Sequence, residues 1–139
     1  MGALEIYLTA RDMAKFGLLY LNDGAYEENQ VISSSWVENS LQAYSKNIKV
    51  GEWLSSRYGF FRDIGYGYQW WSARAGNHHF DYAAGHGGNY IVILHELDMI
   101  IVTTANPLYG PDLAAGGGWE YEGAINNLVG KFIKSLPNE

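Results

Sequence analysis

The residues of this chain that are best suited to chemistry form one short glycine-rich run that contains a histidine. The run reads Gly85-His86-Gly87-Gly88-Asn89. A histidine side chain can exchange a proton near neutral pH, and glycines let a ligand approach the backbone closely because they carry no side chain. Taken alone, such a run is more typical of a turn before a strand, with a histidine that faces solvent. The surrounding sequence decides between the two interpretations.

The chain has no serine in the context of a catalytic nucleophile. A serine hydroxyl attacks a carbonyl only when an adjacent base removes its proton, so catalytic serines occur in recognisable motifs. None of the nine serines has a lysine three positions later, and no Gly-x-Ser-x-Gly elbow occurs. One Tyr-x-Asn triplet, residues 20–22, falls at the end of a predicted helix, and we interpret it as a coincidence. The absence of cysteine excludes thiolate catalysis, disulfides and zinc–cysteine sites.

A metal site is the second chemical possibility. His78 and His79 precede Asp81, and His86 follows in the same stretch of sequence. On a strand, His79 and Asp81 would share one face of the sheet. Zinc sites need ligands at defined spacing, and no fourth ligand is evident. We therefore favour surface histidines and expect neither a metal nor a cofactor.

Composition predicts a single globular domain over residues 1–139. Apolar residues make up 47% of the chain and charged residues 17%, which is enough for a hydrophobic core without a metal or disulfide. The net charge of −6 argues against a basic stripe and therefore against a nucleic-acid partner. No run of eighteen apolar residues occurs, so we expect no membrane segment.

Helical periodicity appears at both ends of the chain. It predicts a helical segment within residues 1–45 and a C-terminal helix over 119–136. Thr9 and Asp12 form a near capping box at the start of the first helix. The three serines at 33–35 offer an N-cap for a second helix.

The middle of the chain is expected to form a sheet. Residues 46–65 have the pattern of a long loop, with a short strand near 58–61, and residues 66–106 have that of antiparallel strands. The individual strands are expected at 66–72, 80–84, 90–94 and 99–105. The last two are apolar at nearly every position, which predicts central strands covered on both faces. The order of elements predicts an α+β fold, with helices packed on an antiparallel β-sheet.

Several stretches of the chain form an ordered pattern that spans roughly residues 5–135. They are LTARDMAKFG at 8–17, VIS at 31–33 with Trp36-Val37, YGYQWW at 66–71, and GHGGN at 85–89 with the hairpin that follows. Together they resemble the serine β-lactamase-like family of class C β-lactamases, penicillin-binding esterases and D-alanyl-D-alanine peptidases. The resemblance implies a partial β-lactamase/transpeptidase-like fold, of which this chain is the C-terminal portion.

The resemblance also implies a reaction and roles for particular residues. Such enzymes hydrolyse an amide or ester through an acyl-enzyme, using a Ser-x-x-Lys nucleophile, a Tyr-x-Asn element and a Lys- or His-x-Gly strand. The third motif alone is present here. His86 would act near the substrate carboxylate or the catalytic tyrosine, Gly87 and Gly88 would admit the substrate, and the backbone N–H of Asn89 would be an oxyanion-hole donor. Without a nucleophile, the chain is expected to be inactive alone.

The partners expected from this resemblance are the missing N-terminal part of the hydrolase domain and, in the parent enzyme, a small acyl substrate. Without that part, an open strand edge and an apolar patch should favour a homodimer or other self-association. Members of the family are often exported or periplasmic, although no signal pattern is visible in this chain.

The alternative hypothesis is a non-catalytic binding or assembly module with an aromatic surface for a glycan or a protein. Aromatic residues are more often core and cross-strand pairs than sugar platforms. The aromatic set considered for this role is Tyr66, Tyr68, Trp70, Trp71, Tyr82 and Tyr90. Trp119, within a glycine-rich loop, is the aromatic residue that we most expect to be exposed.

Overall fold

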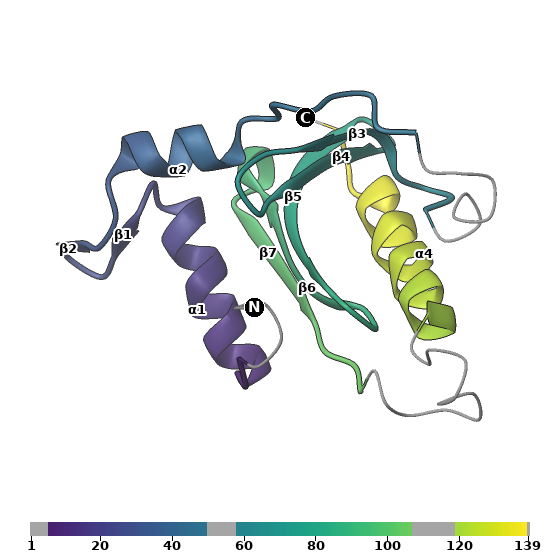
Figure 1. Cartoon of the computed structure of the whole chain (residues 1–139), viewed down its shortest axis with the longest axis horizontal. Helices are drawn as coiled ribbons and strands as arrows, with labels where there is room; N and C mark the ends of the chain where they lie inside the picture. Colours follow the sequence, from purple (N-terminus) through teal and green to yellow (C-terminus); the bar gives the residue numbers. More distant parts are fainter. Residues whose placement is uncertain (1–5, 50–57, 107–118, 139) are drawn as a thin grey trace.

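The fold has three layers, with helices on both faces of one antiparallel sheet. The computed structural model describes residues 6–49, 58–106 and 119–138. Helices α1 (Ala10–Leu21) and α2 (Ser34–Leu41) lie on one side of the sheet, and α4 (Trp119–Ser135) lies on the other, as Figure 1 shows. This arrangement confirms the predicted α+β class with an antiparallel sheet.

The main sheet is a meander of five strands whose order in space follows the order in the chain. Its strands are β3 (Arg62–Tyr66), β4 (Trp71–Ala75), β5 (His78–Gly85), β6 (Asn89–Leu94) and β7 (Met99–Thr103). A 3-10 turn, η1 (His95–Leu97), joins β6 to β7. A separate two-stranded ribbon, β1 (Ala25–Tyr26) and β2 (Asn29–Gln30), follows α1.

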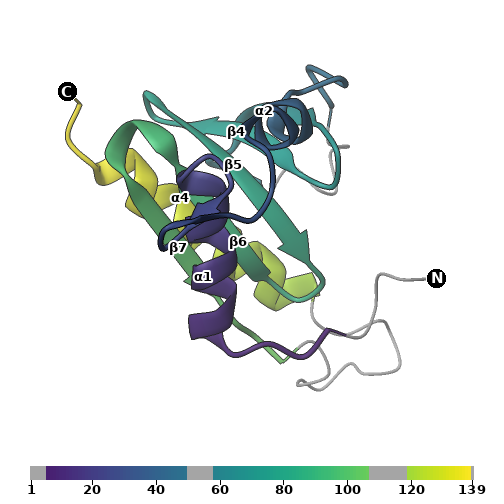
Figure 2. The same cartoon turned by 90° about the vertical axis from the view of Figure 1, so that its left-hand side faces the viewer.

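Both N-terminal helices begin at the side chains that local sequence favours. The hydroxyl of Thr9 accepts a hydrogen bond from the Asp12 N–H (3.2 Å), which satisfies one of the unpaired donors at the start of α1. For α2, the cap is Ser33, whose Oγ accepts from the Trp36 N–H (3.2 Å). Figure 2 shows α1 crossing the face of the sheet over β6 and β7.

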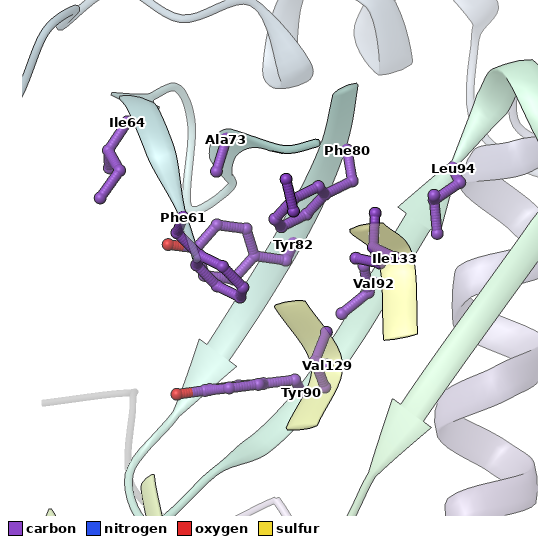
Figure 3. Close-up of a cluster of buried hydrophobic side chains, with 11 residues drawn as sticks. Phe61, Ile64, Ala73, Phe80, Tyr82, Tyr90, Val92, Leu94, Val129 and Ile133 are labelled. Carbon is purple, nitrogen blue, oxygen red and sulfur yellow. The ribbon is translucent and has the colours of Figure 1, made fainter. Parts of the chain in front are cut away.

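The sheet separates two hydrophobic cores because successive side chains of a strand point to opposite faces. Beneath α4, the fully buried rings of Phe80 and Tyr82 pack with Val129 and Ile133, as Figure 3 shows. On the opposite face, Ile93 belongs to a second core beneath α1 and α2. Burying each side chain of this size contributes roughly 1.5–3 kcal/mol, so both helical layers stabilise the sheet.

Two predictions about the first strands are wrong. The aromatic stretch 66–72 is not one strand: β3 ends at Tyr66, a turn follows, and β4 begins at Trp71. The Gly67 N–H donates to the Trp70 carbonyl (2.7 Å), and Gln69 has a left-handed backbone with φ of 66°. The strand expected near 58–61 is a bend and turn, and β3 instead begins at Arg62, inside the predicted loop 46–65.

The two apolar strands of the predicted hairpin differ in burial. Residues 90–94 of β6 are all buried, as predicted for a strand covered on both faces. All five residues of β7 are half-buried, because β7 is an edge strand of the sheet. The prediction that both are central strands is therefore wrong for β7.

Candidate functional site

The glycine-rich run forms the tight turn between β5 and β6. Gly85 pairs with Asn89 across the hairpin, and the Gly88 N–H donates to the Gly85 carbonyl (3.2 Å). Gly87 and Gly88 both have left-handed backbones, with φ of 80° and 94°. Residues with side chains rarely adopt this conformation, so the turn requires glycine at these positions.

The close packing of helix α4 on the turn also requires glycine at position 88. Gly87 and Gly88 are buried, and a Cβ atom added to Gly88 would lie 2.6 Å from Cδ1 of Ile125 on α4. The missing side chain therefore lets the helix pack against the turn. The expected role of both glycines in admitting a substrate stays a prediction.

The side chain of Asn89 ties the turn to the end of the edge strand. Its Nδ2 donates to the His86 carbonyl (3.0 Å), and its Oδ1 accepts from the Ala105 N–H (2.9 Å). Beside it, the Thr103 hydroxyl donates to the Gly88 carbonyl (2.6 Å). These three bonds fix the backbone on which the His86 side chain stands.

The direction of the Asn89 backbone N–H can be inferred from the hydrogen bond of the next residue, Tyr90. The Tyr90 N–H donates to Thr103 Oγ1 on the β7 side (3.2 Å). Because consecutive N–H groups of a strand point to opposite edges, the Asn89 N–H points toward β5, where Gly85 is its partner. An oxyanion would therefore have to compete with the hairpin for this donor.

The imidazole of His86 lies at the exposed tip of the turn and faces a buried carboxylate. Its Nδ1 is 3.7 Å from Oε2 of Glu122, in the first turn of α4. The side chain of His86 is 42% exposed, and that of Glu122 is 10% exposed. The carboxylate of Glu122 is therefore positioned by a packed helix beside an exposed imidazole.

Sequence reasoning missed Glu122, although a signal for it exists. Glu122 lies seven and eleven residues before Val129 and Ile133, which are buried on the sheet-facing side of α4. This spacing places all three side chains on one side of a helix. A charged residue on a buried helix face that is otherwise uncharged is a signal of a paired or functional group.

An apolar cavity of about 570 Å³ borders the same turn on the α1 face of the sheet. Asn89 contributes a polar edge to it, while Met13 and Phe16 of α1 and Ile91 of β6 form apolar walls. Residues 6–8, before α1, and residues 104–105, after β7, also line it, and Ile6 and Tyr7 are 80% and 94% exposed. The cavity is large enough for a small organic group or an apolar side chain cluster.

A second group of titratable side chains lies on β5 and η1. The carboxylate of Asp81 is buried, with the Nε2 atoms of His79 and His95 at 3.9 Å and 3.8 Å. Burial raises the pKa of Asp81 to about 7, and burial lowers the pKa of both histidines. As predicted, His79 and Asp81 share a face of the strand.

These residues do not combine with His86 or His78 into one centre. Among the described residues, no group of three or more His, Asp or Glu side chains is placed to hold a metal ion. His78 points to the opposite face of β5, where Nδ1 lies 2.6 Å from Oε1 of Glu96 and Nε2 lies 3.3 Å from the Leu136 carbonyl. It therefore connects β5 to η1 and to the C-terminal end of α4.

Most of the aromatic residues considered for a sugar platform are core. Trp70, Tyr82 and Tyr90 are buried, and Trp71 is half-buried against Tyr66. Tyr68 is the member of the set whose ring is exposed. The side chain of Trp119, which we expected to be exposed, lies outside the described residues.

Neither the scan of protein-family models nor the search of curated proteins gave a match. Over the part of the chain that the structure describes, no helix is both long and apolar enough to cross a membrane.

Proposed function

We propose that this chain is the C-terminal portion of a penicillin-recognising serine hydrolase, which cleaves an amide or ester through an acyl-enzyme. The observation that carries the proposal is the imidazole of His86, exposed at the tip of a rigid hairpin and facing the buried carboxylate of Glu122. The small acyl substrate and the nucleophile both belong to the complete domain, whose N-terminal part is the principal partner of this chain.

The proposed role of His86 is to donate a hydrogen bond near the substrate carboxylate or near a tyrosine supplied by the N-terminal part. Glu122 supports this role because its buried carboxylate lies 3.7 Å from Nδ1 and can hold the imidazole in position. The Asn89 N–H is the proposed oxyanion-hole donor. To donate to an oxyanion, this N–H has to point toward the substrate instead of toward Gly85.

This proposal requires that the isolated chain be catalytically silent. The purified chain should show no saturable hydrolysis of nitrocefin or p-nitrophenyl acetate, because none of its nine serines has a lysine three positions later. Saturable turnover by the chain alone would contradict the fragment hypothesis.

The positive test adds the polypeptide encoded immediately upstream, either fused or as a separate chain. Activity should appear in the complete protein, and His86→Ala should lower kcat/KM at least ~100-fold, the typical contribution of a positioned proton donor. His95→Ala is the matched control, since His95 lies at the other end of β6. An upstream segment without Ser-x-x-Lys, or equal effects of both substitutions, would reject the proposal.

A further inference from the structure

Three exposed aromatic rings lie together over α2 and the β3–β4 turn. The rings of Tyr44 and Tyr68 are stacked, with centroids 4.8 Å apart and planes at 13°. Trp36, on the outer face of α2, lies 5.9 Å from Tyr68 at 37°. The exposed fractions of Trp36, Tyr44 and Tyr68 are 51%, 51% and 49%. None of these rings belongs to either hydrophobic core, so core packing does not account for them.

Backbone hydrogen bonds hold this cluster in place. The Tyr68 N–H donates to the Ser40 carbonyl at the end of α2 (2.9 Å), and the Tyr44 N–H donates to the Tyr66 carbonyl (3.0 Å). A Cβ atom on Gly67 would lie 2.5 Å from the Ser40 carbonyl oxygen, so the turn is pressed directly against α2. The rings are therefore pre-organised, and a ligand would bind with little loss of side-chain entropy.

The chemistry of the cluster is apolar on the ring faces and polar at the ring edges. The Tyr44 hydroxyl shares a hydrogen bond with Tyr68, which raises the pKa of Tyr44. Each hydroxyl keeps further capacity to donate or accept, because a phenol oxygen has two lone pairs and one proton. Flat aromatic faces with hydroxyl groups at their edges match pyranose rings, whose apolar C–H faces are bordered by hydroxyls.

The size of the cluster favours a saccharide over a protein. A large aromatic side chain buries 150–250 Å² when fully covered, so three half-exposed rings offer roughly 300 Å². A stable protein interface needs about 800 Å² on each partner. We propose that Trp36, Tyr44 and Tyr68 form a binding platform for a neutral oligosaccharide, with pyranose rings stacked on the aromatic faces. This proposal is independent of the hydrolase proposal.

The test is a titration followed by NMR at the indole N–H of Trp36, assigned through Trp36→Phe. The probes are the tetrasaccharides of β-1,4-glucose, β-1,4-N-acetylglucosamine, β-1,4-xylose and α-1,4-glucose. At least one should shift the Trp36 signal saturably, with Kd on the order of 1 mM or tighter. If all four leave this signal unchanged at roughly ten times that concentration, the proposal is wrong.

Variants locate the binding on the platform. Tyr68→Ala, which removes the central ring, should weaken binding at least ~10-fold, a loss typical of one stacked aromatic anchor. Tyr68→Phe retains the stack and should weaken binding less. Tyr7→Ala is the matched control, because Tyr7 is 94% exposed and makes no ring contact with the cluster. Equal loss in Tyr7→Ala, or a Trp36 signal that depends on protein concentration alone, would overturn the proposal.

Discussion

Glu122 faces His86 across the β5–β6 turn, with its Oε2 3.7 Å from the imidazole Nδ1. Helix α4 packs against the turn through Ile125 and Gly88, so the carboxylate and the histidine are positioned by the same interface.

This relationship predicts a positioning role for Glu122 in the complete hydrolase. Glu122→Gln keeps the size of the side chain and removes its charge, and we expect kcat/KM to fall about 10-fold, which corresponds to ~1.4 kcal/mol. Glu38→Gln, on the exposed side of α2, is the control for the same chemical change. Steady-state kinetics that show equal rates for wild type and Glu122→Gln would exclude the role.

Asp81 predicts a pH dependence of stability. Burial raises the pKa of its carboxyl from 3.8 to about 7 in the folded chain, so the folded state holds the proton more tightly than the unfolded state. The stabilisation is therefore complete below pH 3.8 and is lost as the pH rises through 7. The full difference is at most roughly 4 kcal/mol, at ~1.4 kcal/mol per pH unit.

Replacing the carboxyl by an amide tests this dependence. Relative to wild type, Asp81→Asn should become more stable by about 2 kcal/mol between pH 5 and pH 8, measured by urea unfolding. His79 and His95 have lowered pKa values and act with the opposite sign, but they remain in both proteins. The exposed Asp98→Asn is the control, and a similar trend in it would contradict the assignment to Asp81.

The contacts of His78 lead us to predict that its loss destabilises the C-terminal end of α4. Its ring contacts Glu96 and the Leu136 carbonyl, so His78→Ala should lower the free energy of unfolding by about 1–3 kcal/mol. Hydrogen exchange should also become faster over the last turn of α4. His79→Ala is the neighbouring control, and an effect as large in that variant would show that the tether to α4 is unimportant.

The contact between Gly88 and Ile125 predicts an energetic coupling between the β5–β6 turn and α4. Gly88→Ala should destabilise the fold by about 1–3 kcal/mol, because φ is 94° and the new methyl group meets Ile125. In the double variant with Ile125→Ala, part of this cost should disappear, since the contact is with a side chain. Additive costs in a double-mutant cycle would mean that backbone strain alone is responsible.

The exposed residues before α1 predict self-association. Ile6 and Tyr7 lie at an apolar cavity and are almost fully exposed, so the isolated chain should form dimers or larger species at tens of micromolar. Light scattering should give a mass above 15.5 kDa, and the double variant Ile6→Glu, Tyr7→Glu should reduce it. A wild-type mass equal to one chain would contradict this prediction.

The sequence predicts most of the elements, because their patterns are local. The cap at Thr9, the apolar run of β6 and the helical spacing of α4 each lie within one segment. The break between β3 and β4 was not predictable in this way. Aromatic residues recur through it at 66, 68, 70 and 71, and the turn depends on a left-handed Gln69, a residue with no strong preference for that conformation.

The site was predictable only in part. The position of His86 at a turn follows from the glycines, whereas its partner Glu122 lies thirty-six positions later on another layer of the fold. The platform of Trp36, Tyr44 and Tyr68 likewise depends on three separate segments that meet only in the folded chain. In both arrangements the residues are far apart in the sequence, so no local sequence pattern predicts that they meet.

The two faces of β5 limit how this site can change during evolution. Phe80 and Tyr82 project beneath α4, while Asp81 projects beneath the opposite layer. A single residue inserted within the strand would exchange these faces and bring a carboxylate among aromatic rings. An insertion inside β5 should therefore be rejected whichever residue is added, so the strand that leads to His86 must keep its length.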